Sequence, residues 1–176
     1  YELKAKYKDK GFAGITGCDT ELLAWGLDEF GIDFLDEIDS MHGFAYYEPN
    51  KKQITISRDH AGIKPVYYAE IDRGLVFGSE IKGMLDVVPG SRHVDKLAMS
   101  CLAWTGINAT RNTVFSNIKK LLAGETKVYD IASKKFVATK RIFIKPTSDH
   151  RFNRLEFRQM ASATVKMCSI GQRPIG

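Results

Sequence analysis

The sequence predicts an α+β fold, with strands in the middle of the chain and helices on either side of them. Apolar and polar residues alternate at residues 53–57, as in a half-buried strand, and a second short apolar run follows at residues 66–69. Before these strands, at residues 19–30, apolar residues recur with the spacing of a helix. With 176 residues, of which 44% are apolar, the chain can bury one substantial core, or one core and part of another.

The first thirty residues predict two helices. Residues 2–8 are good helix formers and Gly11 stops them, after which residues 12–15 are predicted to form a short strand. A second helix opens at Asp19, and its apolar residues cover much of its circumference. We expect Asp19 to be the N-cap, because its carboxylate can accept a hydrogen bond from the amides of the first turn.

Strands joined by tight turns follow. A short helix at residues 31–39 precedes a strand at residues 40–48, and a hairpin turn at residues 49–52 leads into the strand at residues 53–57. In the strand at residues 40–48, His42 is predicted to be a structural histidine and not a catalytic base.

Residues 58–68 connect two strands and predict a rigid loop. Gly62 can adopt a positive φ and Pro65 fixes its own φ, while the residue before the proline is held in an extended conformation. From composition alone, Arg58 and Asp59 are predicted to form a structural ion pair that ties this loop to a sheet.

The rest of the chain predicts a further strand, three helices and a hairpin. After a turn at residues 72–74 and a strand at residues 75–78, Ser79 is expected to cap a short helix. The remaining predicted elements are a helix from Val94 to Trp104, strands at residues 126–129 and 136–143, and a helix that Asn153 caps and that ends near Cys168.

Composition excludes several classes of protein. The net charge is +5, but the lysines near the start alternate around a helix, so no nucleic-acid site is predicted. No apolar run reaches the roughly 20 residues that cross a bilayer, which predicts a cytoplasmic protein without a membrane segment. The three cysteines lack metal or disulfide spacing, and Cys18 has no neighbouring histidine to act as its base. Because the first residue is Tyr1, we expect a processed chain or a fragment.

The string Arg-Asp-His-Ala-Gly-Ile-Lys-Pro-Val-Tyr-Tyr at residues 58–68 resembles a segment of the asparagine synthetase family, the class II glutamine amidotransferases that amidate aspartate. Residues 17–21, residues 79–85 and residues 113–125 resemble further family segments. Residues 40–48 do so as well. The departures from the family pattern are Ser40, His42, Gly43, Glu48 and Ala123.

The resemblance implies a fold and a division into domains. The fold is a truncated class II glutaminase of the N-terminal nucleophile type, an αββα sandwich of antiparallel sheets, followed by the start of an α/β ATP-dependent synthetase domain. Residues 1–88 would be the C-terminal part of the amidotransferase domain, residues 89–152 a connector with a helix and a hairpin, and residues 153–176 the first, truncated helix of the synthetase domain.

The resemblance also implies a function. The intact protein would hydrolyse glutamine and use the ammonia for ATP-dependent amidation of aspartate to asparagine, with ATP and Mg²⁺ bound outside this chain. Asp19 corresponds to the family residue that holds the α-amino group of glutamine, whereas Arg58, Asp59, Gly62 and Pro65 form a structural loop at a domain interface. No catalytic residue and no metal ligand is assigned to this chain, which would be inactive alone. The expected partners are glutamine, aspartate and ATP, and a homodimer is compatible with the resemblance.

Two alternatives stay open at this point. Related ATP-dependent amidotransferases with another acceptor, such as a sugar acid, a peptide or a lactam precursor, share this architecture. A non-catalytic scaffold remnant of such an enzyme is the second alternative. The sequence downstream of Gly176 would separate the first alternative from an asparagine synthetase.

Overall fold

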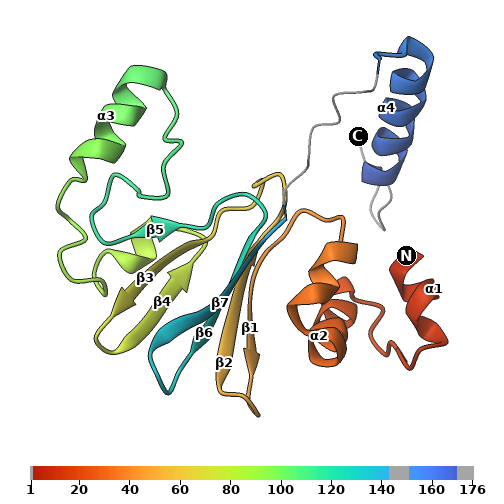
Figure 1. Ribbon diagram of the computed structural model, residues 1–176, viewed down its shortest axis with the longest axis horizontal. Coiled ribbons are helices and arrows are strands. Elements are labelled where there is room, and N and C mark those ends of the chain that lie inside the picture. Colours follow the sequence, from red (N-terminus) through yellow and green to blue (C-terminus); the bar gives the residue numbers. More distant parts are fainter. Residues whose placement is uncertain (1, 143–150, 170–176) are drawn as a thin grey trace. The chain divides into compact units, whose positions relative to one another are not determined.

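A computed structural model describes residues 2–142 and residues 151–169 (Figure 1). The first range belongs to one compact unit and the second range to another. The first unit combines helices with two antiparallel sheets, so the predicted α+β class is confirmed. No helix within the described ranges is long and apolar enough to span a bilayer.

The N-terminal helices pack around an aromatic cluster. They are α1 (Glu2–Lys8), α2 (Asp19–Phe30) and the 3₁₀-helix η1 (Gly31–Glu37). The buried cluster consists of Tyr7, Phe12, Leu22 and Phe34. The strand predicted at residues 12–15 is wrong, because the Phe12 amide donates to the Tyr7 carbonyl and its side chain enters this cluster.

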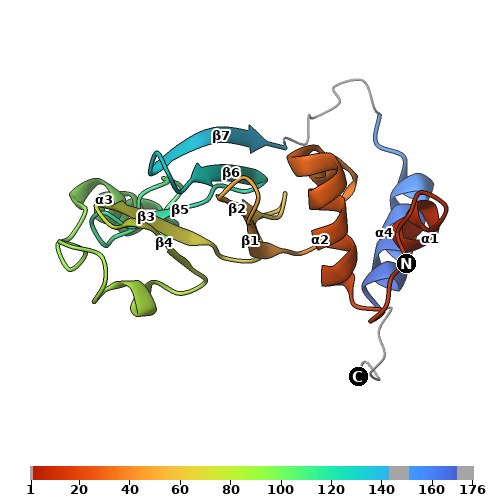
Figure 2. The ribbon, with the colours of Figure 1, turned by 90° about the horizontal axis from the view of Figure 1, so that it is seen from below.

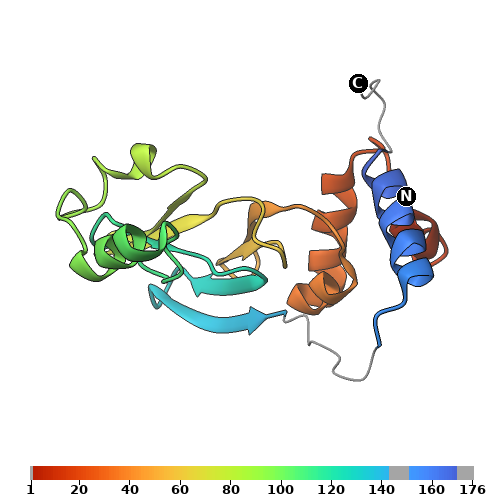
Figure 3. The ribbon, with the colours of Figure 1, turned by 90° about the horizontal axis from the view of Figure 1, so that it is seen from above.

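In the part of the chain that the structure describes, seven strands form two antiparallel sheets (Figure 2). The first sheet has the order β1-β2-β6-β7, with β1 (Gly43–Glu48), β2 (Gln53–Arg58), β6 (Glu125–Asp130) and β7 (Lys135–Arg141). The second sheet has the order β4-β3-β5, with β4 (Gly74–Gly78), β3 (Tyr67–Ile71) and β5 (Lys119–Lys120). The views agree that α2 lies on the β1 side of the first sheet, and that the second sheet lies on the opposite side (Figure 3).

The chain crosses between the two sheets twice. It passes from β2 to β3 through the loop at residues 59–66, and it returns from β5 to β6 through residues 121–124. The hairpin β6–β7 therefore completes the first sheet, and β6 pairs with β2 over five residue pairs from Gln53↔Asp130 to Ser57↔Thr126. The predicted domain boundary at residue 88 stays a prediction, although strands on both of its sides share a sheet.

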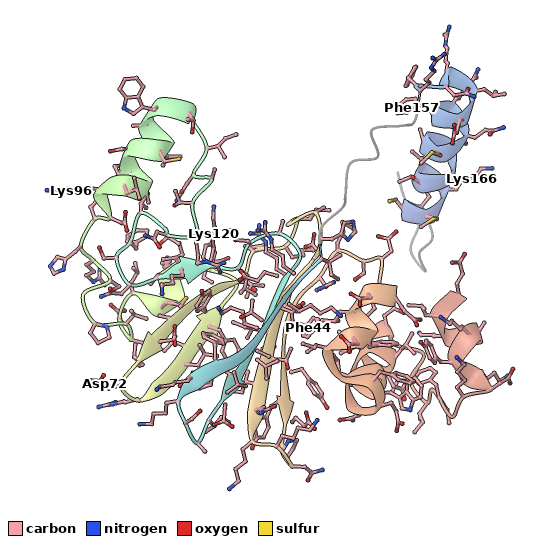
Figure 4. All side chains as sticks on the ribbon, viewed as in Figure 1. Phe44, Asp72, Lys96, Lys120, Phe157 and Lys166 are labelled. Atoms are coloured by element: carbon pink, nitrogen blue, oxygen red, sulfur yellow. The ribbon has the colours of Figure 1, made fainter. Side chains whose placement is uncertain are left out.

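The two sheets also meet at their hairpin tips. Asp72 lies at the tip of the β3–β4 hairpin (Figure 4), and its carbonyl accepts a hydrogen bond from Lys134 Nζ at 2.8 Å. A core cluster of Ile56, Val66, Tyr68 and Leu121 joins residues of both sheets. The sheets thus share one apolar interior.

The remaining helices follow their predicted positions closely. In the first unit they are the 3₁₀-helix η2 (Ile81–Met84) and α3 (Lys96–Thr105), which Asp95 caps through the Ala98 amide at 2.8 Å. Figure 4 shows Lys96 at the start of α3 and Lys120 on β5. The predicted cap at Ser79 is wrong by one residue, since the N-cap of η2 is Glu80.

The second unit contains α4 (Arg154–Cys168). Asn153 caps it by accepting hydrogen bonds from the amides of Leu155 and Glu156, so the predicted cap is confirmed. The predicted strand end at residue 143, the connector residues 143–150 and the final residues 170–176 lie outside the described residues.

Candidate functional site

The Arg58 side chain binds three carbonyl groups around the crossing loop. Its Nε donates to the Lys64 carbonyl at 2.8 Å, and its Nη1 donates to the Leu121 carbonyl at 2.7 Å. Its Nη2 donates to the Gly62 carbonyl at 2.5 Å. A guanidinium carries five N–H donors spread over a fixed plane, so one arginine can bind three carbonyls that lie around its edge.

The Asp59 carboxylate binds backbone amides of the same loop. It is fully buried and accepts hydrogen bonds from the amides of Ile63, at 2.8 Å, and Lys64, at 2.9 Å. Burial acts to raise the pKa of Asp59, but the two amides and the charges of His42 and Arg58 outweigh it, so the pKa lies below its ordinary value.

The loop clamps both crossings between the sheets. Its Asp59 carbonyl accepts the Gly124 amide at 2.8 Å, while Arg58 reaches Leu121, so the β2–β3 and β5–β6 connections are bound to each other. Gly62, at φ +68°, supplies the left-handed turn that the sequence predicts. The predicted Arg58–Asp59 ion pair is wrong in the described chain: the two side chains bind different backbone groups.

Asp19 lies apart from this loop, at the start of α2. It is the first helical residue, and Cys18 occupies the N-cap position without a side-chain hydrogen bond, so the predicted capping role of Asp19 is wrong. The Asp19 side chain is 96% exposed, and its carboxylate lies 3.1 Å from Lys4 Nζ. The structure thus leaves this carboxylate accessible to an ammonium group from solution.

Cys18 is exposed and its thiol faces the first turn of α2. The Thr20 hydroxyl and the amides of Thr20 and Glu21 hold the pKa of Cys18 below its ordinary value, although burial and the charge of Asp19 oppose this. Within the described residues no histidine bonds to this sulfur.

A hydroxyl network around His42 was not predicted from the sequence. Its Nδ1 lies 3.0 Å from Ser40 Oγ, its Nε2 lies 3.2 Å from Ser57 Oγ, and Ser57 in turn bonds to Thr126 at 2.7 Å. Burial lowers the pKa of His42 below its ordinary value, with the charge of Asp59 opposing and that of His60 reinforcing this shift. The assignment of His42 as a structural histidine stays a prediction that this network supports.

A buried ion pair was also missed. Glu125, on β6, has a side chain only 2% exposed, and it accepts from Arg111 Nη1 at 2.6 Å and from the Leu122 amide at 2.9 Å. Arg111 also reaches the Tyr68 hydroxyl at 3.4 Å. No local spacing predicts this pair, because Arg111 lies in a loop and Glu125 begins a strand.

A groove of about 310 Å³ lies between the end of α2 and the first sheet. Leu27 and Ile32 line its helical wall, and Tyr46, Gln53 and Thr55 line its sheet wall. The Tyr46 hydroxyl donates to Asp28, and burial together with this carboxylate raises the pKa of Tyr46 to about 12. Asp19 does not line the groove: eight residues of helix, roughly 12 Å, separate it from Leu27.

The described residues contain no cluster of three or more His, Cys, Asp or Glu side chains that could hold a metal ion. The placement of ATP and Mg²⁺ outside this chain stays a prediction. The chemistry that the described residues support is binding through single charged groups.

Comparison with known proteins identifies the domain. The family model described as a glutamine amidotransferase domain matches residues 1–141. The chain is 34% identical over 128 residues to glutamine-hydrolyzing asparagine synthetase 2 of Bacillus subtilis strain 168. This alignment covers 70% of this chain and 17% of that protein. It is 30% identical over 132 residues to a putative glutamine-hydrolyzing asparagine synthetase 2 of Methanocaldococcus jannaschii. This alignment covers 74% of this chain and 25% of that protein.

A third relative is the glutamine-hydrolyzing asparagine synthetase B of Escherichia coli strain K12, with 33% identity over 104 residues, 58% of this chain and 18% of that protein. The aligned segments thus span 17–25% of the length of these relatives. Since the family model matches residues 1–141, most of the sequence, this chain belongs to the glutamine amidotransferase domain family.

Proposed function

We propose that this chain is part of a glutamine-hydrolysing asparagine synthetase, in which glutamine hydrolysis supplies ammonia for the ATP-dependent amidation of aspartate. The observation that carries this proposal is the amidotransferase match over residues 1–141, together with relatives that are named glutamine-hydrolyzing asparagine synthetases. The roles of aspartate and ATP as substrates are proposed from this family resemblance.

Within this function, Asp19 binds the α-ammonium group of glutamine. Its carboxylate is exposed on the first turn of α2, and the Lys4 ammonium already lies 3.1 Å from it, which supports an ammonium ligand there. The structural loop of Arg58, Asp59, Gly62 and Pro65 makes no ligand contact in this proposal. It holds the two sheets together and is proposed to lie near the interface with the synthetase domain.

The hydrolytic chemistry is assigned to residues outside this chain. An N-terminal cysteine attacks the glutamine carboxamide, a thioester forms, and ammonia leaves before water releases glutamate. This chain contributes the ammonium-binding carboxylate on α2 and two antiparallel sheets, and it is inactive alone.

The finer architecture belongs to the same proposal. The two antiparallel sheets would be the sheets of an αββα sandwich, and α4 would be the first helix of the synthetase domain, outside the matched residues 1–141. ATP and Mg²⁺ would bind to that domain beyond this chain. A cytoplasmic location and a homodimer complete the set of predictions that the family resemblance supports.

The test compares the full-length protein with the 176-residue chain. Glutamate release from glutamine is measured for both, with Asp19→Asn introduced into the full-length protein. We expect release by the full-length protein, a loss of about tenfold or more in kcat/KM for glutamine in Asp19→Asn because a charge-assisted contact is lost, and none by the chain alone. Glutamine hydrolysis by the isolated chain would contradict the assignment of the nucleophile to a residue elsewhere.

A further inference from the structure

Glu21 builds the turn that precedes α2. Its Oε1 accepts the Ile15 amide at 2.8 Å, and its Oε2 accepts the Thr16 amide at 3.0 Å and the Thr16 hydroxyl at 2.9 Å. The same hydroxyl accepts the Cys18 amide at 3.2 Å. One carboxylate on the first turn of the helix therefore binds the backbone of Ile15 and Thr16 directly, and that of Cys18 through the Thr16 hydroxyl.

This turn has little else to hold it. Residues 13–20 are exposed, and they contribute no side chain to the aromatic cluster of the N-terminal helices. Lys4 Nζ adds two contacts from α1, one with the Gly17 carbonyl and one with the Asp19 carboxylate. Because apolar packing is absent here, the direction of the Asp19 side chain depends on these polar contacts.

We propose that Glu21 is a positioning residue for glutamine binding: it holds the turn at residues 15–18 so that the Asp19 carboxylate faces the α-ammonium group of the substrate. This inference rests on the proposed function of Asp19. In this proposal Glu21 acts on the turn and not on the substrate, because its two oxygens accept three hydrogen bonds from residues 15 and 16.

The electrostatics agree with this role. The amides of Ile15 and Thr16, followed by the Thr16 hydroxyl, hold the pKa of Glu21 below its ordinary value against the effect of burial, and Lys4 adds to the shift. Glu21 is therefore charged at neutral pH, and its charged form is the one that accepts these bonds.

The test uses the full-length protein and two nitrogen donors. Glutamine-dependent product formation needs the glutamine site, whereas formation from added ammonium chloride bypasses it. We expect Glu21→Ala to lower kcat/KM for glutamine by about ten- to a hundredfold, mainly through KM, because a misplaced binding group costs about this much. The ammonia-dependent rate should stay within about twofold of wild type, and Glu21→Gln, which keeps one acceptor oxygen, should give an intermediate loss.

Glu29→Ala is the matched control, since Glu29 lies on the same helix and is exposed. It should change neither rate. An equal fall of both rates in Glu21→Ala would show a merely structural role and overturn the inference. So would an unchanged KM for glutamine in Glu21→Ala when Asp19→Asn raises it. If Asp19→Asn has no effect, the proposed function of Asp19 fails and this inference fails with it.

A second measurement does not depend on activity. In the 176-residue chain, amide NMR signals of Ile15 and Thr16 should move in Glu21→Gln and stay in place in Glu29→Gln, because only Glu21 accepts from these amides. Unchanged signals of both residues in Glu21→Gln would overturn the inference.

Discussion

Asp59→Asn tests how the Arg58 loop is held. In the wild-type chain the buried carboxylate accepts two amides, at 2.8 and 2.9 Å. An asparagine offers one oxygen to these two donors, so one buried amide is left without an acceptor, at a cost of about 1–3 kcal/mol. The other amide then bonds to a neutral oxygen in place of a carboxylate, at a further cost of about 1 kcal/mol. Relief of the buried charge offsets part of this, and we expect the free energy of unfolding to fall by about 2 kcal/mol.

The assay is urea unfolding of the 176-residue chain, followed by far-UV circular dichroism. Asp86→Asn is the control, because the Asp86 side chain is 83% exposed and its pairing with Arg92 is a surface ion pair worth less than about 1 kcal/mol. Equal unfolding free energies for Asp59→Asn and Asp86→Asn would refute the reasoning.

Acid adds an independent check on the same carboxylate. The pKa of Asp59 is lower in the folded chain than its ordinary value of about 3.9, so its contribution to stability is present above that value. The contribution is lost as the pH falls through the folded pKa. Asp59→Asn should therefore reduce the loss of stability between pH 5 and about pH 2.

Three further predictions concern other contacts. Gly124→Ala should lower the free energy of unfolding by more than about 1 kcal/mol in urea titrations, because φ is +71° and a Cβ would overlap the Ile142 carbonyl. Arg111→Met should destabilise the chain by about 3–5 kcal/mol, since it leaves Glu125 buried without its cation. His42→Phe should remove the part of the pH dependence between pH 8 and pH 5 that protonation of this imidazole causes: a histidine with a lowered folded pKa contributes stability above about pH 6.5 that is lost as the pH falls.

Controls accompany the first two of these changes. Gly83→Ala matches Gly124→Ala, since a Cβ at Gly83 meets nothing within 4 Å. Arg92→Met matches Arg111→Met on an exposed ion pair. A His42→Phe chain that keeps the wild-type pH dependence would contradict the role of His42.

Local patterns predicted most of the secondary structure. Alternation located β2, a short apolar run located β3, and the cap at Asn153 was confirmed, because strands and caps depend on neighbouring residues. The strand predicted at residues 12–15 was wrong because the Phe12 side chain packs in the aromatic cluster and its backbone continues the turn after α1. Helix starts were misplaced by one residue where two polar residues compete for the cap, as at Cys18 and Asp19.

Long-range contacts were the part that the sequence did not reveal. The Arg58 loop was recognised as rigid, but its clamp on residues 121–124 depends on how the two sheets cross. Glu125 and Arg111 are polar residues whose burial follows from the tertiary fold, and Lys140 pairs with Asp33 and Asp36, more than 100 positions away in the sequence. Local spacing carries no information about such pairs.

Transfer of the glutamine amide nitrogen to aspartate tests the central proposal most directly. The full-length protein is incubated with aspartate, ATP, Mg²⁺ and glutamine labelled with ¹⁵N at its amide, and asparagine is analysed by mass spectrometry. The proposal predicts asparagine that carries the label, and less of it in Asp19→Asn. Glutamate release without labelled asparagine would contradict the assignment of aspartate as the acceptor.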